Sequence, residues 1–168
     1  MGHTVLIVDD EPNIVTSLRR ALEEEGYRAV VAGSGPIALE KAATTAPEVV
    51  LLDVVMPELD GIEVLRRLKA AQPELPVVMM SGNATIETAV RATKLGAFDF
   101  VEKPATTEKI LICLENALKL TRLRRENAEL RQRVDGQGEM IGASPAMRRV
   151  LAEIAKIAPS QEKVLISG

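Results

Sequence analysis

Apolar and polar positions alternate with two different periods along the first 118 residues. Short runs of β-branched and aliphatic residues are separated by longer segments with the spacing of amphipathic helices. The short runs predict five strands, at 4–8, 28–32, 48–52, 76–80 and 98–101. The longer segments predict helices at 12–25, 35–45, 61–71 and 85–95, and a last helix that begins at 106. Strands that alternate with helices are typical of an α/β domain with a parallel sheet.

Three of the predicted strands are apolar throughout instead of alternating, namely Val5–Val8, Val49–Leu52 and Val77–Met80. A strand has this pattern when helices cover both faces of its sheet. We therefore expect residues 1–118 to form a doubly wound, five-stranded parallel sheet of the flavodoxin-like type. Sites in such sheets lie at the carboxyl ends of the strands.

Polar residues follow these strand ends. Asp9 and Asp10 follow the first strand, Asp53 the third and Ser81 the fourth, and Lys103 comes just after the fifth. Parallel strands end at one edge of a sheet, so these side chains are expected to converge. Clustered carboxylates need a cation, and oxygen ligands of this kind suit Mg²⁺. Asp10 and Asp53 are the candidates to hold the ion, with Asp9 acting partly through water.

A metal-held carboxylate beside a lysine and a hydroxyl is equipped for phosphoryl transfer. Asp53 is the expected nucleophile toward phosphorus, Lys103 would offset charge on the phosphoryl oxygens, and Ser81 would hydrogen-bond one of them. Each residue alone has an ordinary explanation, such as a helix cap or a solvent-facing side chain. The combination at the ends of four strands is what indicates a site.

Four segments around these residues resemble the receiver-domain signature of two-component response regulators. They are Val8–Glu11, Asp53–Gly61, Ser81–Thr85 and Phe100–Pro104, and the resemblance spans residues 4 to about 118. It implies that Asp53 accepts a phosphoryl group from a sensor histidine kinase.

The resemblance also implies a role for each neighbour of Asp53. Asp10, Asp53 and the backbone carbonyl of Val55 would bind Mg²⁺, with Asp9 supporting the metal through water and Lys103 bridging to the acceptor. Ser81 and Phe100 would move together when the acceptor is phosphorylated. The peptide bond between Lys103 and Pro104 would be cis.

Two rival functions remain. A phosphatase with an aspartyl intermediate usually carries a second acid two residues after its nucleophile, whereas this chain has Val55 there. A phosphorelay receiver without transcriptional output is the other alternative. The chain itself is not expected to be an enzyme beyond slow loss of its own phosphate.

The last predicted helix is longer than a receiver requires. Neither glycine nor proline interrupts 106–134, which corresponds to about 43 Å of helix. A heptad counted from Cys113 places Leu120, Asn127 and Val134 at a positions and Asn116, Leu123 and Leu130 at d positions. This pattern predicts a parallel coiled-coil homodimer over 119–134, with Asn127 fixing its register. A solvated helix that spaces two domains and a basic helix inserted into DNA are the alternatives.

The glycines at 136 and 138 predict that the helix ends at 134 and that 135–143 form a flexible linker. Residues 144–168 resemble the opening of the AAA+ ATPase domain of NtrC-type activators, which depend on sigma-54. This resemblance implies that a longer protein binds ATP, sigma-54 RNA polymerase and DNA. Because the 168 residues contain no Walker A motif, no Walker B motif and no DNA-binding helix-turn-helix, none of these activities is expected of the chain directly.

Charge and composition narrow the classes of partner. Residues 1–118 hold 11 basic and 18 acidic side chains, which disfavours nucleic-acid binding by this part, whereas 119–134 hold 6 basic and 2 acidic ones. The one cysteine, Cys113, is expected to be a packed apolar residue. Without a signal peptide or an apolar run of about 20 residues, the protein is expected to be cytoplasmic and to have no membrane partner.

Overall fold

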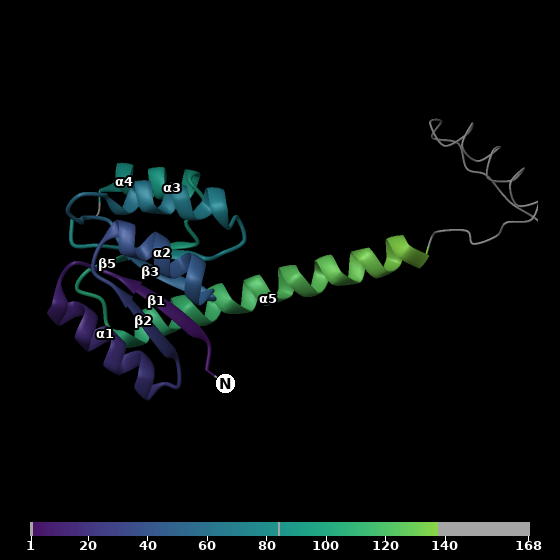
Figure 1. The fold of residues 1–168 in the computed structure, drawn as a ribbon, viewed down its shortest axis with the longest axis horizontal. Helices are drawn as coiled ribbons and strands as arrows, with labels where there is room; N and C mark the ends of the chain where they lie inside the picture. The colour runs from purple at the N-terminus through teal and green to yellow at the C-terminus, as the bar shows by residue number, and fades with distance from the viewer. Residues whose placement is uncertain (1, 84, 138–168) are drawn as a thin grey trace, which may run out of the picture. The chain divides into compact units, whose positions relative to one another are not determined.

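The computed structural model describes residues 2–83 and 85–137, and it places ten elements in strict strand–helix alternation (Figure 1). The strands are β1 (Thr4–Val8), β2 (Arg28–Ala32), β3 (Val49–Asp53), β4 (Val77–Ser81) and β5 (Asp99–Glu102). The helices are α1 (Pro12–Glu24), α2 (Gly35–Thr45), α3 (Gly61–Ala71), α4 (Ile86–Lys94) and α5 (Thr107–Gln137). All ten elements lie where the sequence predicted them, within a few residues at each end.

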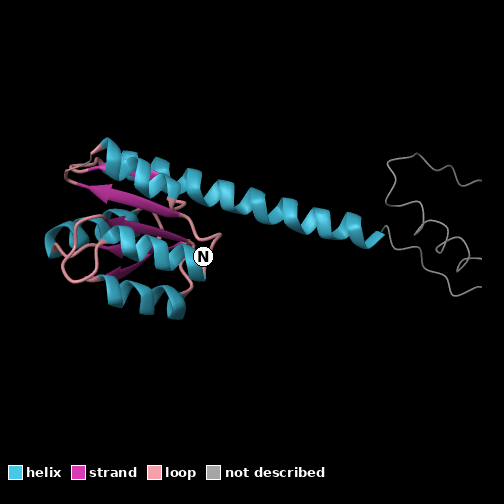
Figure 2. Cartoon of the chain, turned by 90° about the horizontal axis from the view of Figure 1, so that it is seen from above, coloured by secondary structure: helices cyan, strands magenta, loops and turns pink. Residues whose placement is uncertain are grey.

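The five strands form one parallel sheet in the order β2-β1-β3-β4-β5. The predicted doubly wound, flavodoxin-like fold is therefore confirmed. Helices α2, α3 and α4 cover one face of the sheet, while α1 and α5 cover the other (Figures 1 and 2). Every residue of β3 and β4 is buried, because these strands have a helical layer on both sides.

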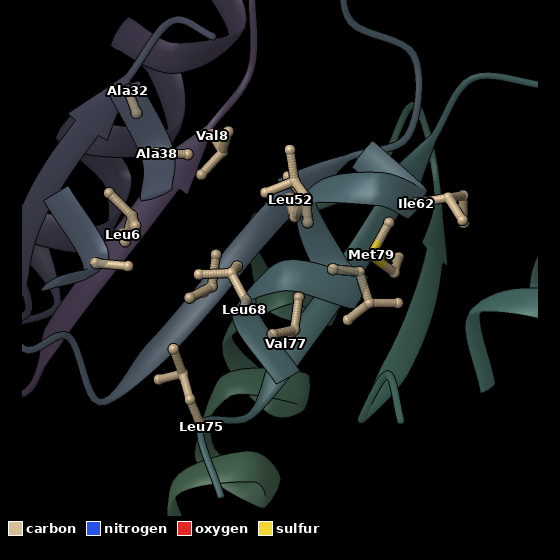
Figure 3. Packing of buried hydrophobic residues seen from close by; sticks show 14 of the residues in the cluster. Leu6, Val8, Ala32, Ala38, Leu52, Ile62, Leu68, Leu75, Val77 and Met79 are labelled. Atoms are coloured by element: carbon tan, nitrogen blue, oxygen red, sulfur yellow. The ribbon is translucent and has the colours of Figure 1, made fainter. Parts of the chain in front are cut away.

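Successive side chains of each central strand enter different halves of the core. Leu6 and Val8 pack on the side of α2, α3 and α4, whereas Val5 and Ile7 pack on the side of α1 and α5. Figure 3 shows the first of these clusters, in which Leu68 of α3 lies with side chains of β1, β3 and β4. Both clusters are almost entirely aliphatic, and together they hold the strands at fixed register beneath the site.

Glycines follow two of the helices, and a side chain caps the start of another. Gly26 and Gly96 follow α1 and α4 with φ angles of +84° and +91°, a region that favours glycine. Thr85 was predicted as the first residue of its helix but is instead the N-cap of α4, with its side chain accepting a hydrogen bond from the Thr88 amide. Capping side chains belong just outside the first turn, which explains the shift by one residue.

Helix α5 differs from its prediction at two points. It does not end at Val134 but continues to Gln137, so the predicted linker at 135–143 begins too early. One glycine in a helix interior costs only about 1 kcal/mol, which does not break a long helix. The other predicted part of that linker, 138–143, and the predicted ATPase fragment, 144–168, lie outside the described residues.

The second difference concerns Cys113, which was counted as the first a position of the heptad. Cys113 is buried in the core of the domain with Leu114, and its Sγ donates to Oδ2 of Asp99 at 3.3 Å. Burial, followed by the hydrogen bond to Asp99, raises the pKa of the thiol to about 11. The expectation of a packed cysteine is confirmed, but this residue contacts its own sheet and is not available to a second helix.

None of the helices in the described part of the chain combines the length and the apolar character that a membrane span requires.

Candidate functional site

The site lies at the carboxyl edge of the sheet. Asp9 follows β1, Asp53 is the last residue of β3, Ser81 is the last residue of β4, and Lys103 follows β5. Since β1, β3, β4 and β5 are consecutive in the sheet, these ends form one continuous edge. The sequence placed Asp53 and Ser81 just after their strands, whereas the ladder extends to include both. The predicted convergence at one edge is confirmed.

Lys103 connects two buried carboxylates. Its Nζ lies 2.6 Å from Oδ2 of Asp9 and 3.0 Å from Oδ1 of Asp53. Asp9 is 1% exposed and Asp53 is 4% exposed, so neither carboxylate has enough water around it to carry a charge unaided. A buried charge is tolerated when a partner of opposite sign reaches it. Lys103 provides that partner from the loop after β5.

Three carboxylates at this edge form a group that can bind a divalent cation. Asp9, the exposed Asp10 and Asp53 each offer one oxygen, and these oxygens all lie within 4.8 Å of one another. Carboxylate oxygens are the hard ligands that Mg²⁺ favours. The three negative charges exceed the single positive charge of Lys103, so a divalent cation would balance the excess. Asp9 also accepts a hydrogen bond from the Glu11 amide at 2.9 Å, so both of its oxygens are engaged.

The pKa values of Asp53 and Lys103 follow from this crowding. Burial raises the pKa of Asp53, and although Lys103 lowers it, the net pKa stays above the ordinary value. Burial alone would lower the pKa of Lys103, but its hydrogen bonds to Asp9 and Asp53 outweigh that effect and leave the pKa raised. Lys103 therefore remains a cation beside Asp53.

The remaining predicted residues lie on the strands of this edge or in the loops that follow them. Ser81 is buried, its Oγ accepts a hydrogen bond from the Asn83 amide at 3.3 Å, and its carbonyl accepts one from the Lys103 amide at 2.8 Å. Phe100 is half-buried and packs against the core cluster beneath α4. Val55 is 67% exposed in the loop after β3. The peptide bond between Lys103 and Pro104 is cis, as the resemblance implied.

Two residues of the site received no role from the sequence. The carboxylate of Glu11 lies 3.9 Å from Nζ of Lys103, at the exposed rim. Gly61, the first residue of α3, lies so close to Asp53 that a Cβ atom there would stand 1.9 Å from the Asp53 carbonyl oxygen. A glycine directly after the helix cap Asp60 was the available signal, because nothing about a helix start requires glycine at that position.

Comparison with known families agrees with this arrangement. The family model of the response regulator receiver domain matches residues 5–115, a range that includes Asp9, Asp10, Asp53, Ser81 and Lys103. The chain belongs to the response regulator receiver family. Its part in two-component response regulation, which the resemblance of four segments implied, is thereby confirmed.

The similarity to individual regulators extends beyond the receiver. The nitrogen assimilation regulatory protein NtrX of Azorhizobium caulinodans is 41% identical over 170 residues, covering 100% of this chain and 37% of the relative. The regulatory protein AtoC of Escherichia coli K12 is 39% identical and is matched by 98% of this chain over 36% of its length. The chain thus spans somewhat more than a third of the curated relatives it matches.

Solved structures match this chain over a similar range of residues. The crystal structure of NtrX from Brucella abortus superposes with a TM-score of 0.75 at 37% identity, covering 98% of this chain and 36% of that one. The crystal structure of the receiver domain alone from the same protein superposes with a TM-score of 0.66 at 40% identity. That match covers 68% of this chain and 98% of the receiver.

Proposed function

We propose that Asp53 accepts a phosphoryl group from the phosphohistidine of a sensor kinase in the cytoplasm. The observation that carries this assignment is the position of Asp53, a buried carboxylate 3.0 Å from a lysine inside a cluster of three carboxylates. A carboxylate oxygen of Asp53 attacks phosphorus, a phosphorus–oxygen bond forms, and the bond from phosphorus to the imidazole nitrogen of the donor breaks. Lys103 stabilises the negative charge on the equatorial oxygens during this transfer.

The residues present fit Mg²⁺ as the resident metal. Asp10, Asp53 and the backbone carbonyl of Val55 are the proposed ligands, and Asp9 acts through water because its own oxygens already accept hydrogen bonds from Lys103 and Glu11. When bound, Mg²⁺ offsets the charge that the phosphoryl oxygens bring to an already acidic edge. Asp10 is exposed, so the ion reaches the cluster from solvent.

Two further residues are proposed to respond to the phosphoryl group. The Oγ of Ser81, which accepts a hydrogen bond from the Asn83 amide, donates its own proton to a phosphoryl oxygen, and this contact draws the end of β4 toward Asp53. Phe100 is half-buried and adjoins this end of the sheet on β5, so its ring can occupy a different position when β4 shifts. Helix α5 begins at Thr107, five residues after β5 ends at Glu102, and is the proposed route to the output.

The proposed output is transcription activation by a longer protein. The similarity to NtrX and AtoC over 98–100% of this chain supports an activator more than a receiver that only passes phosphate onward. NtrX from Brucella abortus was crystallised with ADP and with ATP, which supports ATP binding by the corresponding part of the longer protein. We assign binding of sigma-54 RNA polymerase and DNA to the longer protein as well.

Helix α5 is proposed to dimerise the chain through a parallel coiled coil. Leu120, Leu123 and Leu130 are 38%, 51% and 59% exposed, and Asn127 lies exposed between them at the spacing of one heptad seam. Val134 occupies the next a position of the same helix. Because Cys113 is buried, the seam begins at Asn116 and not at Cys113.

The test of the acceptor is direct chemical labelling. The chain is incubated with Mg²⁺ and acetyl phosphate, and intact mass is measured before and after treatment with hydroxylamine, which cleaves acyl phosphates. One phosphoryl group is expected on the native chain, and none on Asp53→Asn, because an amide is a poor nucleophile. Stable labelling of the Asp53→Asn variant to the native extent would contradict the assignment.

A further inference from the structure

The first turn of α3 lies against the backbone of the acceptor residue. A Cβ atom on Gly61 would stand 1.9 Å from the carbonyl oxygen of Asp53 and 2.9 Å from Cα of Val54. Both are backbone atoms, so they cannot rotate out of the way as the end of a side chain can. Gly61 does not have a positive φ angle, so this position needs glycine for space and not for conformational freedom.

The same contact closes the loop that follows the acceptor. The Gly61 amide donates to the carbonyl oxygen of Val54 at 2.9 Å, so the two ends of the loop touch. Within the loop the Leu59 amide donates to the Pro57 carbonyl at 2.8 Å, and Glu58 has a φ angle of +67°, which non-glycine residues adopt rarely. These hydrogen bonds fix the shape of the loop, and the fixed loop keeps Glu58 in its strained conformation.

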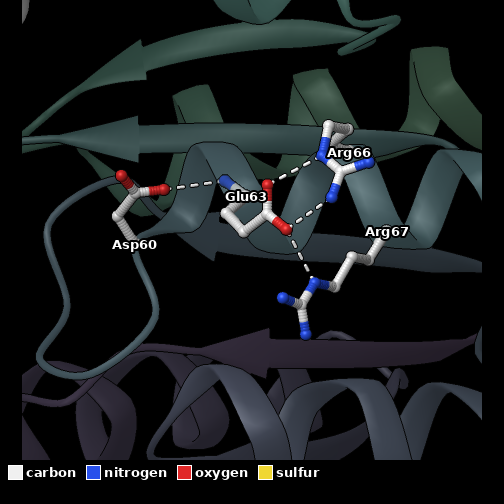
Figure 4. Close-up of polar contacts among 4 residues, drawn as sticks. All are labelled: Asp60, Glu63, Arg66 and Arg67. Carbon is white, nitrogen blue, oxygen red and sulfur yellow. Dashed lines mark hydrogen bonds and ion pairs between the residues drawn. The ribbon is translucent and has the colours of Figure 1, made fainter.

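A helix cap holds α3 at this contact. Oδ1 of Asp60 accepts the Glu63 amide at 2.7 Å, and the Glu63 carboxylate pairs with Arg66 and Arg67 at 2.6 and 2.7 Å (Figure 4). The cap satisfies an amide that the helix itself leaves unpaired. The ion pairs are largely exposed and contribute little stability, but they join the first two turns of the helix. The first turn of α3, which contacts Asp53, is therefore held by the Asp60 cap at its start and by the Glu63 ion pairs at its end.

We propose that Gly61 is a positioning residue for phosphoryl transfer. Its missing side chain lets α3 seat against Asp53, which holds the acceptor carboxylate and the carbonyl of Val55 in the arrangement that the reaction requires. The proposal rests on Asp53 being the acceptor. A side chain at this position displaces the peptide after Asp53 and moves the carboxylate relative to Lys103. A misplacement of about 1 Å is enough to lower a rate by about a hundredfold.

A buried glycine can also serve packing alone, and Gly35 provides the matched control. Gly35 begins α2 as Gly61 begins α3, and both are buried. A Cβ atom on Gly35 would stand 2.8 Å from Cβ of Leu59 and 2.8 Å from Cγ2 of Val64, which are side-chain atoms. Alanine at Gly35 therefore presses on side chains of the loop after Asp53 and of α3, but not on the backbone of Asp53. The pair of variants thus separates altered packing of this segment from direct contact with the acceptor backbone.

The experiment compares Gly61→Ala with Gly35→Ala in the full 168-residue chain. Unfolding temperature is followed by circular dichroism, the phosphorylation rate with saturating acetyl phosphate and Mg²⁺ by intact mass, and Mg²⁺ affinity by calorimetry. Both variants are expected to unfold at lower temperature. Only Gly61→Ala is expected to lose at least tenfold in rate and at least threefold in Mg²⁺ affinity, with Gly35→Ala within twofold of the native chain. Equal rates and affinities in the two folded variants overturn the proposal.

A second pair of variants decides the question if Gly61→Ala does not fold. Asp60→Ala removes the cap that seats α3, whereas Asp60→Ser keeps a capping oxygen. The rate is expected to fall about threefold in Asp60→Ala and to return to the native value in Asp60→Ser; equal rates overturn the proposal. A native chain that takes no label on Asp53 contradicts the proposed function itself, and this result is distinct from labelled variants that all react alike.

Discussion

The edge of the sheet and the exposed row of α5 depart from the usual distribution of side chains in opposite directions. At the edge, the charged Asp9 and Asp53 are almost fully buried. Along α5, Leu120, Leu123 and Leu130 expose between 38% and 59% of their surface. Burying charge costs free energy unless it is paired, and leaving leucine in water forgoes about 1.5–3 kcal/mol for each side chain.

The two regions differ in what would remove the unfavourable feature, which is unbalanced charge at the edge and exposed apolar surface on α5. The buried carboxylates already have Lys103, and the excess negative charge that remains can be neutralised by one small ion. A row of leucines over several turns can be covered only by a surface of similar length. Within the same helix, Ile110, Leu114 and Ala117 are already covered by the sheet. The two departures therefore match the two partners proposed above, a divalent cation and a second helix.

The largest expected effect is on the exposed row. Leu123→Asp combined with Leu130→Asp is expected to raise the dissociation constant of the dimer about a thousandfold or more, because each helix loses two apolar contacts and gains two charges. Sedimentation at tens of micromolar should show the native chain as a dimer and the variant as a monomer. The matched control is Thr121→Asp with Ala128→Asp, which adds the same charges at the same seven-residue spacing away from the seam. A native chain that sediments as a monomer removes the dimer and leaves α5 as a spacer.

A smaller effect is expected when the charge balance at the sheet edge is altered. Lys103→Met leaves Asp9 and Asp53 buried without a cation and should lower the free energy of unfolding by about 2 kcal/mol, less than for a fully buried pair because Lys103 is 15% exposed. Asp10→Asn removes one negative charge and should raise it by about 0.5–1 kcal/mol. Urea unfolding with a chelator present measures both changes.

The same urea unfolding, repeated with Mg²⁺ in place of the chelator, tests the proposed metal ligands. The native chain should gain stability in proportion to the logarithm of the free Mg²⁺ concentration, because the ion binds the folded state. Asp10→Asn should lose most of that gain, since it removes a proposed ligand while leaving the fold intact. If the native chain and Asp10→Asn gain equal stability from Mg²⁺, the proposed ligand set is wrong.

The smallest expected effect is on the pKa of Tyr27. It tests whether the inner half of α5, the part that carries Ile110, Leu114 and Ala117, packs against the sheet in solution. The pKa of Tyr27 is raised, first by burial and then by Glu115 of α5 and by Glu25. Because the folded state favours the neutral phenol, the stability linked to Tyr27 is fully present below about pH 10 and is lost as pH rises toward the folded pKa. The chain has one tyrosine and no tryptophan, so absorbance at 295 nm follows this group alone.

The titration has a simple control. The midpoint should lie above that of the chain in concentrated urea, and Glu115→Gln should lower it part of the way. Equal midpoints in the folded and unfolded chains would show that the inner half of α5 does not pack beside Tyr27.

The periodicity of the sequence was enough to predict the sheet, its layers and the edge where the site lies. Val49–Leu52 and Val77–Met80 are apolar without interruption, and a strand with that pattern has few environments open to it. The chemistry of the edge followed from residues at or just beyond the strand ends, such as Asp53 and Lys103. Parallel strands have their carboxyl ends at one edge, so the residues at those ends gather there. The strand order β2-β1-β3-β4-β5 was given only by the structure.

Other features depended on contacts between segments far apart in the sequence. Cys113 fitted the heptad as well as Leu120 does, but only the packed structure shows that one is covered by the sheet and the other is exposed. The apolar periodicity of a helix shows which side chains share a face, but it does not show which surface covers that face. Gly61 could be read only as the start of a helix, because its 1.9 Å approach to the Asp53 carbonyl depends on how α3 seats against β3. The sequence by itself determined the elements and the chemistry at their ends, whereas tertiary packing decided which groups are close enough to constrain one another, since close approach is a property of the whole core and not of local spacing.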